Sequence, residues 1–191
     1  MKITVLDASM TDARFADNVR QQIQNISNDE GHEVAVFTLK ELCVAPCCGY
    51  FRCWINSPGT CVIQDTVNKI VDSIVNSDCW VFITNVTFGG YSSELKKVID
   101  RLPPLMLPHF MRVNGEVHHR PRYRKIPNLL VFGYAESEDK ESENIFQAIV
   151  ARNSVNFHMN KAVAKVFLKD KDKNFISQKV REAFDEVGAI S

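Results

Sequence analysis

The chain has 191 residues, the size of a single domain. Its 45% hydrophobic and 24% charged residues are typical of a globular protein that folds without help from metals or disulfides. Lys plus Arg and Asp plus Glu each total 23, so the formal net charge is +0, which argues against a general nucleic-acid-binding protein. No segment approaches the roughly 20 apolar residues that span a bilayer, so we expect no membrane partner.

Strand and helix patterns alternate along the whole chain. Strand patterns occupy residues 3–6, 33–37, 79–84, 128–134 and 162–168. The third and fourth are almost entirely apolar, which is typical of strands covered on both faces of a parallel sheet. Because the chain begins in a strand, without the long apolar segment of a secretory signal, we expect a cytoplasmic protein.

Helical periodicity follows each strand. The five apolar stripes start at Phe15, Val67, Leu95, Ile145 and Ile176. Gly31 suits the left-handed position after the first helix, and Asp65 suits the N-cap of the second. Five strands alternating with five helices predict a doubly wound α/β sheet, in one domain spanning residues 1–191.

Two long irregular stretches interrupt this alternation, at residues 38–64 and 103–127. Loops of this length are uncommon in a compact domain and are usually functional. Open α/β sheets also bind ligands at the carboxyl ends of their strands. Candidate functional residues are therefore sought in these two loops and at those strand ends.

The junction after the first strand contains Ser9, Thr11 and Arg14 beside the start of a helix. Hydroxyls, a guanidinium and free helix N–H groups suit a phosphate, although ordinary capping by Ser9 or Thr11 explains the same pattern. The glycine-rich fingerprints of dinucleotide-binding and P-loop folds are absent from the sequence.

The junction after the third strand contains the pair Gly89–Gly90 between Phe88 and Tyr91. Adjacent glycines allow a planar ligand to approach the backbone, with the aromatic rings as walls. A flexible turn with packed aromatics is the alternative.

Five of the six cysteines crowd into residues 43–61, which in a reducing compartment suggests a metal or redox site before disulfides. They are Cys43, Cys47, Cys48, Cys53 and Cys61. Cys79 falls inside a predicted strand, and we expect it in the core.

Four segments carry a family resemblance: residues 45–54 (APCCGYFRCW), 58–65 (PGTCVIQD), 86–92 (VTFGGYS) and 95–101 (LKKVIDR). On these the chain resembles the flavodoxin-fold NAD(P)H-dependent FMN reductases, in the iron–sulfur-flavoprotein-like branch. The resemblance implies a flavodoxin-like five-stranded parallel sheet of order 2-1-3-4-5 with helices on both faces. It also implies an oxidoreductase whose FMN takes hydride from NAD(P)H and passes electrons to a small-molecule or protein acceptor.

The resemblance assigns FMN contacts to three loops. The phosphate loop would use Ser9, Thr11, Arg14 and Phe15. The loop along the isoalloxazine, with backbone N–H groups at the flavin edge, would use Asn85, Val86, Thr87, Phe88 and Gly89. The loop on the other side of the ring would use Tyr134, Ala135 and Glu136. No side chain receives a catalytic role, because the flavin carries the chemistry.

The sequence departs from cluster-bearing relatives at Tyr50, which occupies the second ligand position when Cys47, Cys53 and Cys61 are registered on the cysteine motif. Four thiolates hold a four-iron cluster, so we expect neither an iron–sulfur cluster nor another metal here. The first loop also has Ala8 and Ala13 where relatives often have glycine, which leaves the individual phosphate donors open.

The second long loop holds an apolar run and a basic run. We expect the apolar run to form a homodimer or tetramer interface beside the flavin, through Leu105, Met106, Leu107, Phe110 and Met111. If the basic run is extended, Arg120, Arg122 and Arg124 share one face that could reach a phosphate. The pair His118–His119 lacks metal-ligand spacing, and a solvated loop is the alternative to an interface.

Two other functions remain open at this point. One is a flavodoxin-like electron carrier that a partner protein reduces. The other is a redox or metal sensor built on Cys47, Cys48, Cys53 and Cys61. The zero net charge and the basic loop favour the reductase over the carrier.

Overall fold

The structure, a computed structural model, describes residues 1–10, 13–168 and 171–190. Its central sheet has the strand order β2-β1-β3-β6-β7, and every adjacent pair is parallel. This order confirms the predicted flavodoxin-like 2-1-3-4-5 topology. The strands are β1 (Lys2–Ala8), β2 (Glu33–Thr38), β3 (Cys79–Asn85), β6 (Asn128–Ala135) and β7 (Ala162–Leu168).

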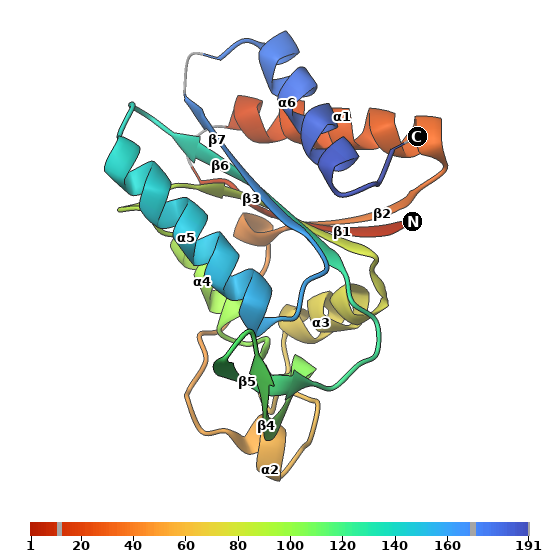
Figure 1. The fold of residues 1–191 in the computed structure, drawn as a ribbon, viewed down its shortest axis with the longest axis vertical. Helices are drawn as coiled ribbons and strands as arrows, with labels where there is room; N and C mark the ends of the chain where they lie inside the picture. The colour runs from red at the N-terminus through yellow and green to blue at the C-terminus, as the bar shows by residue number, and fades with distance from the viewer. Residues whose placement is uncertain (11–12, 169–170, 191) are drawn as a thin grey trace.

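Helices cover both faces of the sheet (Figure 1). Helices α1 and α6 lie on one face, and α3, α4 and α5 lie on the other. Their bounds are α1 (Ala13–Glu30), α3 (Thr66–Asn76), α4 (Ser93–Ile99), α5 (Lys140–Asn156) and α6 (Lys173–Glu186). The predicted end of α1 and start of α3 are confirmed, since Gly31 has a φ of +68° and the Asp65 carboxylate accepts the Val67 amide at 2.9 Å.

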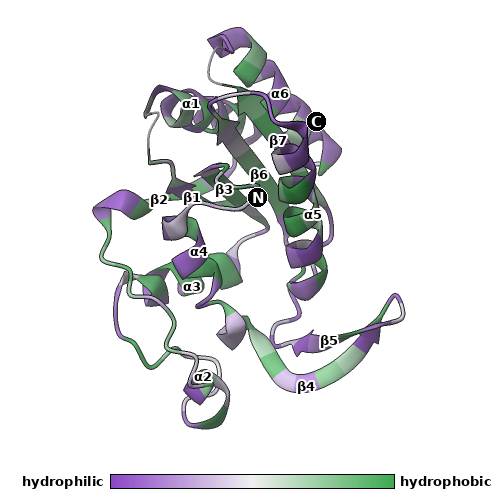
Figure 2. Cartoon of the chain, turned by 90° about the vertical axis from the view of Figure 1, so that its left-hand side faces the viewer, coloured by the Kyte–Doolittle hydropathy of each residue, from purple (hydrophilic) through white to green (hydrophobic). Residues whose placement is uncertain are grey.

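The core has two apolar layers, one on each face of the sheet. Val19 and Phe184 lie in the layer under α1 and α6, whereas Leu95 and Phe146 lie in the opposite layer. The apolar colour along the central strands is visible in Figure 2. Cys79 belongs to this core as predicted, and burial raises the pKa of its thiol to about 12.

The stretch 103–127 is not the irregular loop that the sequence predicted. After a 3-10 helix, η2 (Pro103–Leu105), strands β4 (Met106–Val113) and β5 (Glu116–Pro121) form an antiparallel hairpin. An irregularity in the register between Met106 and Phe110 hides the two-residue alternation. The Asn114–Gly115 pair, with φ values of 51° and 86°, is a typical two-residue hairpin turn that the sequence analysis overlooked.

The stretch 38–64 has little regular structure. It contains a 3-10 helix, η1 (Leu39–Glu41), and the four-residue helix α2 (Arg52–Ile55). Helix α2 lies beside the hairpin, at the lower end of the molecule in Figure 1. The Trp54 indole joins the two by donating to the Pro103 carbonyl oxygen at 2.9 Å.

Candidate functional site

A cavity of about 700 Å³ opens at the carboxyl ends of β3, β6 and β7. Seven residues that the sequence analysis assigned to the flavin line it: Asn85, Val86, Thr87, Phe88, Tyr134, Ala135 and Glu136. They come from two loops about 50 residues apart in the sequence. Because the carboxyl ends of parallel strands meet at one edge of a sheet, the fold brings these loops to the same place.

Buried hydroxyls hold the first of these loops. The amide of Ser92 donates to the Thr84 hydroxyl oxygen at 2.9 Å, and the Ser92 hydroxyl donates to the Ala8 carbonyl at 3.0 Å. The carboxyl ends of β1 and β3 and the start of α4 are thereby joined. The loop between Thr84 and Ser92 therefore leaves the sheet from a fixed base.

The tip of this loop is a tight turn from Thr87 to Gly90. Each of these two residues donates its amide to the carbonyl of the other, at 3.0 and 2.8 Å. Phe88 and Gly89 between them have φ values of 49° and 74°, the pattern of a type I′ turn. Phe88 is 98% exposed, so a large apolar side chain is held in water by a backbone conformation that non-glycine residues rarely adopt.

The two cavity loops are joined to each other and to α5. The amide of Val86 donates to the Tyr134 carbonyl at 2.7 Å. A Cβ atom built on Gly89 would lie 2.7 Å from Cγ2 of Ile145, so only glycine fits against α5 there.

The backbone donors expected at the flavin edge need a correction. The amides of Val86 and Thr87 already bond to Tyr134 and Gly90. Within the described residues, the amides of Phe88 and Gly89 donate no hydrogen bond to the protein. The donors that this loop can offer a ligand are therefore those at its tip.

The junction after β1 is organised around the buried carboxylate of Asp7. This carboxylate accepts the Ser9 hydroxyl at 2.6 Å and the Ser9 amide at 3.0 Å, and it pairs with Arg20 at 2.9 Å. The Met10 amide donates to the side-chain oxygen of Asn85 at 2.7 Å. The Ser9 hydroxyl proton is thus engaged inside the protein.

The other residues of the predicted phosphate loop differ in position. Thr11 lies outside the described residues. Arg14 is exposed in the first turn of α1. Phe15 is a core residue, 4% exposed, whose ring packs against Tyr134 and Phe167 at centroid distances of 5.3 and 5.4 Å. The helical stripe that begins at Phe15 already carried this signal.

Sequence reasoning missed the far wall of the cavity. Val166, Leu168, Lys171 and Phe175 line it from β7 and from the start of α6. Glu138, Asp139, Ser142 and Glu143 line it beyond β6. The strand pattern at 162–168 was a usable signal, because β7 ends beside β6 at the same edge of the sheet.

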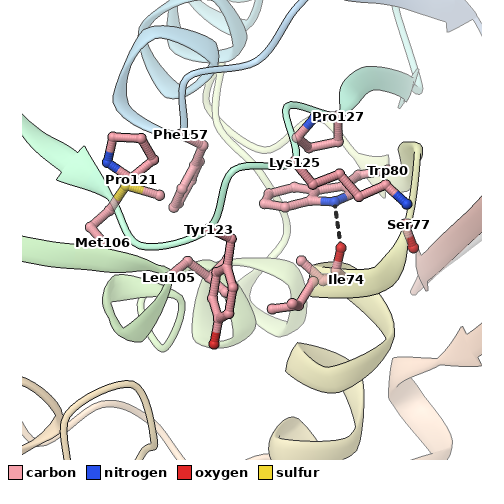
Figure 3. A pocket seen from close by; sticks show the side chains of 11 residues that line it. Ile74, Ser77, Trp80, Leu105, Met106, Pro121, Tyr123, Lys125, Pro127 and Phe157 are labelled. Atoms are coloured by element: carbon pink, nitrogen blue, oxygen red, sulfur yellow. Dashed lines mark hydrogen bonds between the residues drawn. The ribbon is translucent and has the colours of Figure 1, made fainter.

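A second cavity, drawn in Figure 3, lies between α3 and the hairpin. It encloses about 30 Å³, room for about one water molecule. Its walls include Trp80, whose indole donates to the Ile74 carbonyl at 3.1 Å, and the rings of Tyr123 and Phe157. A cofactor-sized ligand therefore fits only the larger cavity of the two.

The model of one protein family, NADPH-dependent FMN reductase, matches residues 1–125. This chain belongs to that family. The match confirms the family that the sequence motifs indicated. An iron-sulfur flavoprotein from Methanocaldococcus jannaschii is 33% identical over 101 residues, 52% of this chain and 51% of that protein. The matched segment spans about half the length of that relative.

Solved structures share the fold of this FMN reductase family member. A NAD(P)H:quinone oxidoreductase from Methanothermobacter marburgensis superposes with a TM-score of 0.73 at 15% identity, over 98% of both chains. An azoreductase from Bacillus anthracis superposes with a TM-score of 0.67 at 13% identity, over 99% of both. At such identities the likeness confirms the flavodoxin-like architecture alone. No helix within the described ranges is long and apolar enough to cross a bilayer.

The cysteine loop is anchored by a buried ion pair. The side chain of Arg101 is 0% exposed, binds the Asp65 carboxylate, and donates to the carbonyls of Ala45 and Ile63 at 3.2 and 2.9 Å. Asp65 in turn accepts the Ala45 amide at 3.0 Å. Both ends of the cysteine-containing segment are therefore fixed to the end of α4.

Three thiols of this loop interact electrostatically. Burial raises the pKa of the Cys53 thiol, and the neighbouring Cys61 and Cys47 raise it further. All six cysteines are free. Within the described ranges, no group of three or more His, Cys, Asp or Glu side chains is arranged to hold a metal ion. The expectation of a loop without iron stays a prediction.

The hairpin lies away from the large cavity of its own chain. Helix α5 starts beside the cavity and ends at the hairpin, where Asn156 contacts the His118 ring at 3.0 Å and Arg152 pairs with Glu116 at 2.6 Å. The hairpin therefore does not reach the cavity of its own chain, and the contacts within one chain do not test the predicted interface beside the flavin. It stays open for the site of a second copy.

The side chains of the hairpin also differ from expectation. Leu105 and Met106 were expected at an interface, but they are 4% and 8% exposed in the core, whereas Phe110 is 62% exposed. Arg122 donates to the Pro104 carbonyl at 2.8 Å, so its guanidinium joins the end of β5 to η2 and is not a free phosphate ligand. The His119 ring packs against Phe110 at 4.5 Å.

Proposed function

We propose that this protein binds FMN in the 700 Å³ cavity and acts as an NAD(P)H-dependent flavin oxidoreductase. The observation that carries the proposal is the convergence of the two predicted flavin loops on one cavity, at the ligand-binding edge of the sheet. Its volume falls within the usual range for small-molecule sites, about 300–1,000 Å³. The name of the family supports the same cofactor and donor.

Bound FMN would supply the redox chemistry, by accepting hydride and delivering electrons. The residues of this chain would position it. The glycines at positions 89 and 133 let the turn after β3 and strand β6 pack closely against Ile145, Val86 and Phe146, which fixes the loops that line the cavity. The amides of Phe88 and Gly89 would be the donors that this turn offers the ligand, and Arg14 would support the phosphate.

The test is a visible spectrum of protein purified without oxygen, followed by FMN titration and addition of NADH or NADPH. We expect a flavin absorbance band that NAD(P)H bleaches. A flavin that only a partner protein reduces would favour the electron-carrier function instead. A protein without affinity for FMN would overturn the proposal, and stoichiometric iron with labile sulfide would overturn the expectation of an iron-free cysteine loop.

We expect Arg14→Ala to weaken FMN binding by about tenfold or more without unfolding the protein. A charge-assisted hydrogen bond contributes roughly 1.5–3 kcal/mol, and Arg14 is exposed in the first turn of α1. Fluorescence titration of FMN measures the affinity, and Arg14→Lys shows how much of it comes from charge alone. An unchanged dissociation constant in Arg14→Ala would remove this residue from the phosphate site.

We further propose that the protein is a homodimer or tetramer that pairs through the exposed apolar side chains of α2 and the hairpin. Phe51, Ile55, Phe110 and Val117 are between 58% and 74% exposed on neighbouring elements. An apolar surface of this kind on one end of a molecule is typical of a protein contact.

The pairing makes a direct prediction for sedimentation velocity at micromolar concentration. The wild-type protein should sediment as a dimer or larger, and Phe110→Ser with Val117→Ser should raise the dissociation constant at least tenfold, because each buried apolar side chain contributes roughly 1.5–3 kcal/mol. Val36→Ser, at an exposed position on the edge strand β2, is the matched control. A monomeric wild-type protein would contradict the proposal.

We also propose a cytoplasmic location. Six unpaired cysteines, three of them exposed, suit a reducing compartment. Fractionation of cells that express the tagged protein measures this directly.

A further inference from the structure

The walls of the large cavity are strongly acidic. Among the described residues that line it are four carboxylates, Glu136, Glu138, Asp139 and Glu143, and one basic residue, Lys171. The chain as a whole carries equal numbers of acidic and basic residues, so this excess is local. Lys169 and Asp170 lie outside the described residues and add no net charge between them.

Two of the four carboxylates serve helix α5. Asp139 is the N-cap and accepts the amides of Glu141 and Ser142 at 3.1 and 3.2 Å. Hydrogen bonds from the hydroxyl and the amide of Ser142 lower the pKa of Asp139, so it stays charged at neutral pH. Glu143 pairs with Lys140 at 2.9 Å.

Among the described residues, the other two carboxylates form no such contact. Glu136 and Glu138 are both exposed, directly after β6, and within the described part of the chain neither forms an ion pair. Among the described residues the lysine of the cavity forms no ion pair with them, since its ammonium group lies over the ring of Phe175, 5.2 Å from the centroid, and its single positive charge is fewer than the negative charges of the lining. The loop after β6 therefore presents an excess of negative charge to a ligand in the cavity, whereas the FMN phosphate is assigned to the junction after β1.

The remaining features of the cavity point to a flat ligand. Phe88 lines it from the turn after β3, almost fully exposed, and Phe175 lines it from the first turn of α6. Aromatic walls favour planar ring systems, whether neutral or cationic. The aromatic walls can therefore pack against any nicotinamide or quinone ring. The property by which the cavity can distinguish one such ligand from another is the charge of the ligand.

We infer that Glu136 and Glu138 select reactants with the least negative charge, so that this protein uses NADH in preference to NADPH and reduces neutral or cationic aromatic acceptors in preference to anionic ones. The 2′-phosphate of NADPH adds about two negative charges at neutral pH. At about 7 Å in water, repulsion between two unit charges changes a binding constant about threefold, before screening by salt. The inference rests on the proposed function and departs from the nucleotide in the name of the family.

The first experiment measures equilibrium binding of NAD⁺ and NADP⁺ to the FMN-loaded protein by calorimetry, at low and high salt. We expect NAD⁺ to bind roughly threefold to tenfold more tightly at low ionic strength, with the ratio approaching one at high salt. Equal affinities, tighter binding of NADP⁺, or no binding of either nucleotide would overturn the inference.

The second experiment uses Glu136→Gln with Glu138→Gln, substitutions that remove charge and keep shape. The NAD⁺ to NADP⁺ affinity ratio should fall about threefold or more, and the kcat/KM for an anionic naphthoquinone sulfonate should rise relative to that for neutral menadione. Glu141→Gln, in the first turn of α5 just after this loop and outside the cavity lining, is the control whose ratios should stay at wild-type values. An unchanged ratio in the double variant would overturn the inference.

Failure of the inference is distinguishable from failure of the proposed function. A protein that binds FMN and oxidises NAD(P)H without charge discrimination would defeat the inference alone. A protein that does not bind FMN at all would defeat the proposed function first, and the NAD⁺ and NADP⁺ affinities of the apoprotein would then decide the charge selection separately.

Discussion

Gly89→Ala should lower the free energy of unfolding by about 2–4 kcal/mol and abolish most of the affinity for FMN. Two separate effects add. Gly89 has a φ of +74°, which strains any residue with a Cβ atom. That Cβ would also lie 2.7 and 2.8 Å from the Cγ2 and Cβ atoms of Ile145 on α5. Chemical denaturation measures the first loss and FMN fluorescence titration the second.

Two further variants separate these effects. Gly115→Ala is the control for φ alone, because Gly115 has a φ of +86° and a Cβ there would meet nothing within 4 Å. Gly89→Ala with Ile145→Gly removes both of these contacts, and a glycine at this exposed position of α5 costs only about 1 kcal/mol of its own. We expect the double variant to recover part of the stability and part of the FMN affinity. No recovery would show that the contact with α5 does not set the position of the turn.

The sheet could be predicted from the sequence because its signal is local and redundant. Residues 79–84 and 128–134 are almost entirely apolar, and each is followed by a helix with a recognisable apolar stripe. A parallel sheet with short right-handed connections then leaves few topologies. The positions of the cavity loops could be predicted by the same reasoning, because placing the strands in the sheet also places their carboxyl ends.

The β4–β5 hairpin and the far wall of the cavity were harder to predict from the sequence, because both depend on strand pairings that no local sequence pattern contains. Pro108 and the register irregularity disguise β4 as a loop, so Leu105 and Met106 were expected at an interface although they belong to the core. Phe175 reaches the cavity only because β7 lies next to β6. Such contacts are properties of the assembled sheet.

Arg101→Met should be among the most destabilising single substitutions, with a loss of about 3–5 kcal/mol in unfolding free energy at pH 7. The substitution removes the fully buried partner of Asp65 and leaves unpaired a carboxylate that is only 13% exposed. The carbonyls of Ala45 and Ile63 lose their donors as well. The matched variant Asp65→Asn and the double variant with both substitutions complete a cycle. We expect the double variant to lose less than the sum of the two single losses.

The pH dependence of these variants distinguishes a lost ion pair from a simple cavity. Burial raises the pKa of Asp65, but hydrogen bonds from Arg101 and from the amides of Ala45 and Val67 lower it by more, so the net pKa lies below the ordinary value of 3.8. A carboxyl with a depressed folded-state pKa contributes stability above the unfolded-state pKa and loses it as the pH falls through the folded-state pKa. The wild-type protein should therefore lose more stability than Asp65→Asn as the pH is lowered below about 4.

The direction in which the stability deficit of Arg101→Met changes with pH follows from the same linkage between protonation and folding. Without the guanidinium, the pKa of Asp65 in the folded state rises, so its protonation relieves the buried unpaired charge at a higher pH than in the wild-type protein. The deficit of Arg101→Met relative to wild type should therefore shrink as the pH falls from 7 to 3. Denaturation midpoints across this range check it. A deficit that stays constant with pH would mean that Arg101 stabilises the cysteine loop through packing and its bonds to backbone carbonyls, and that its charge opposite Asp65 contributes little.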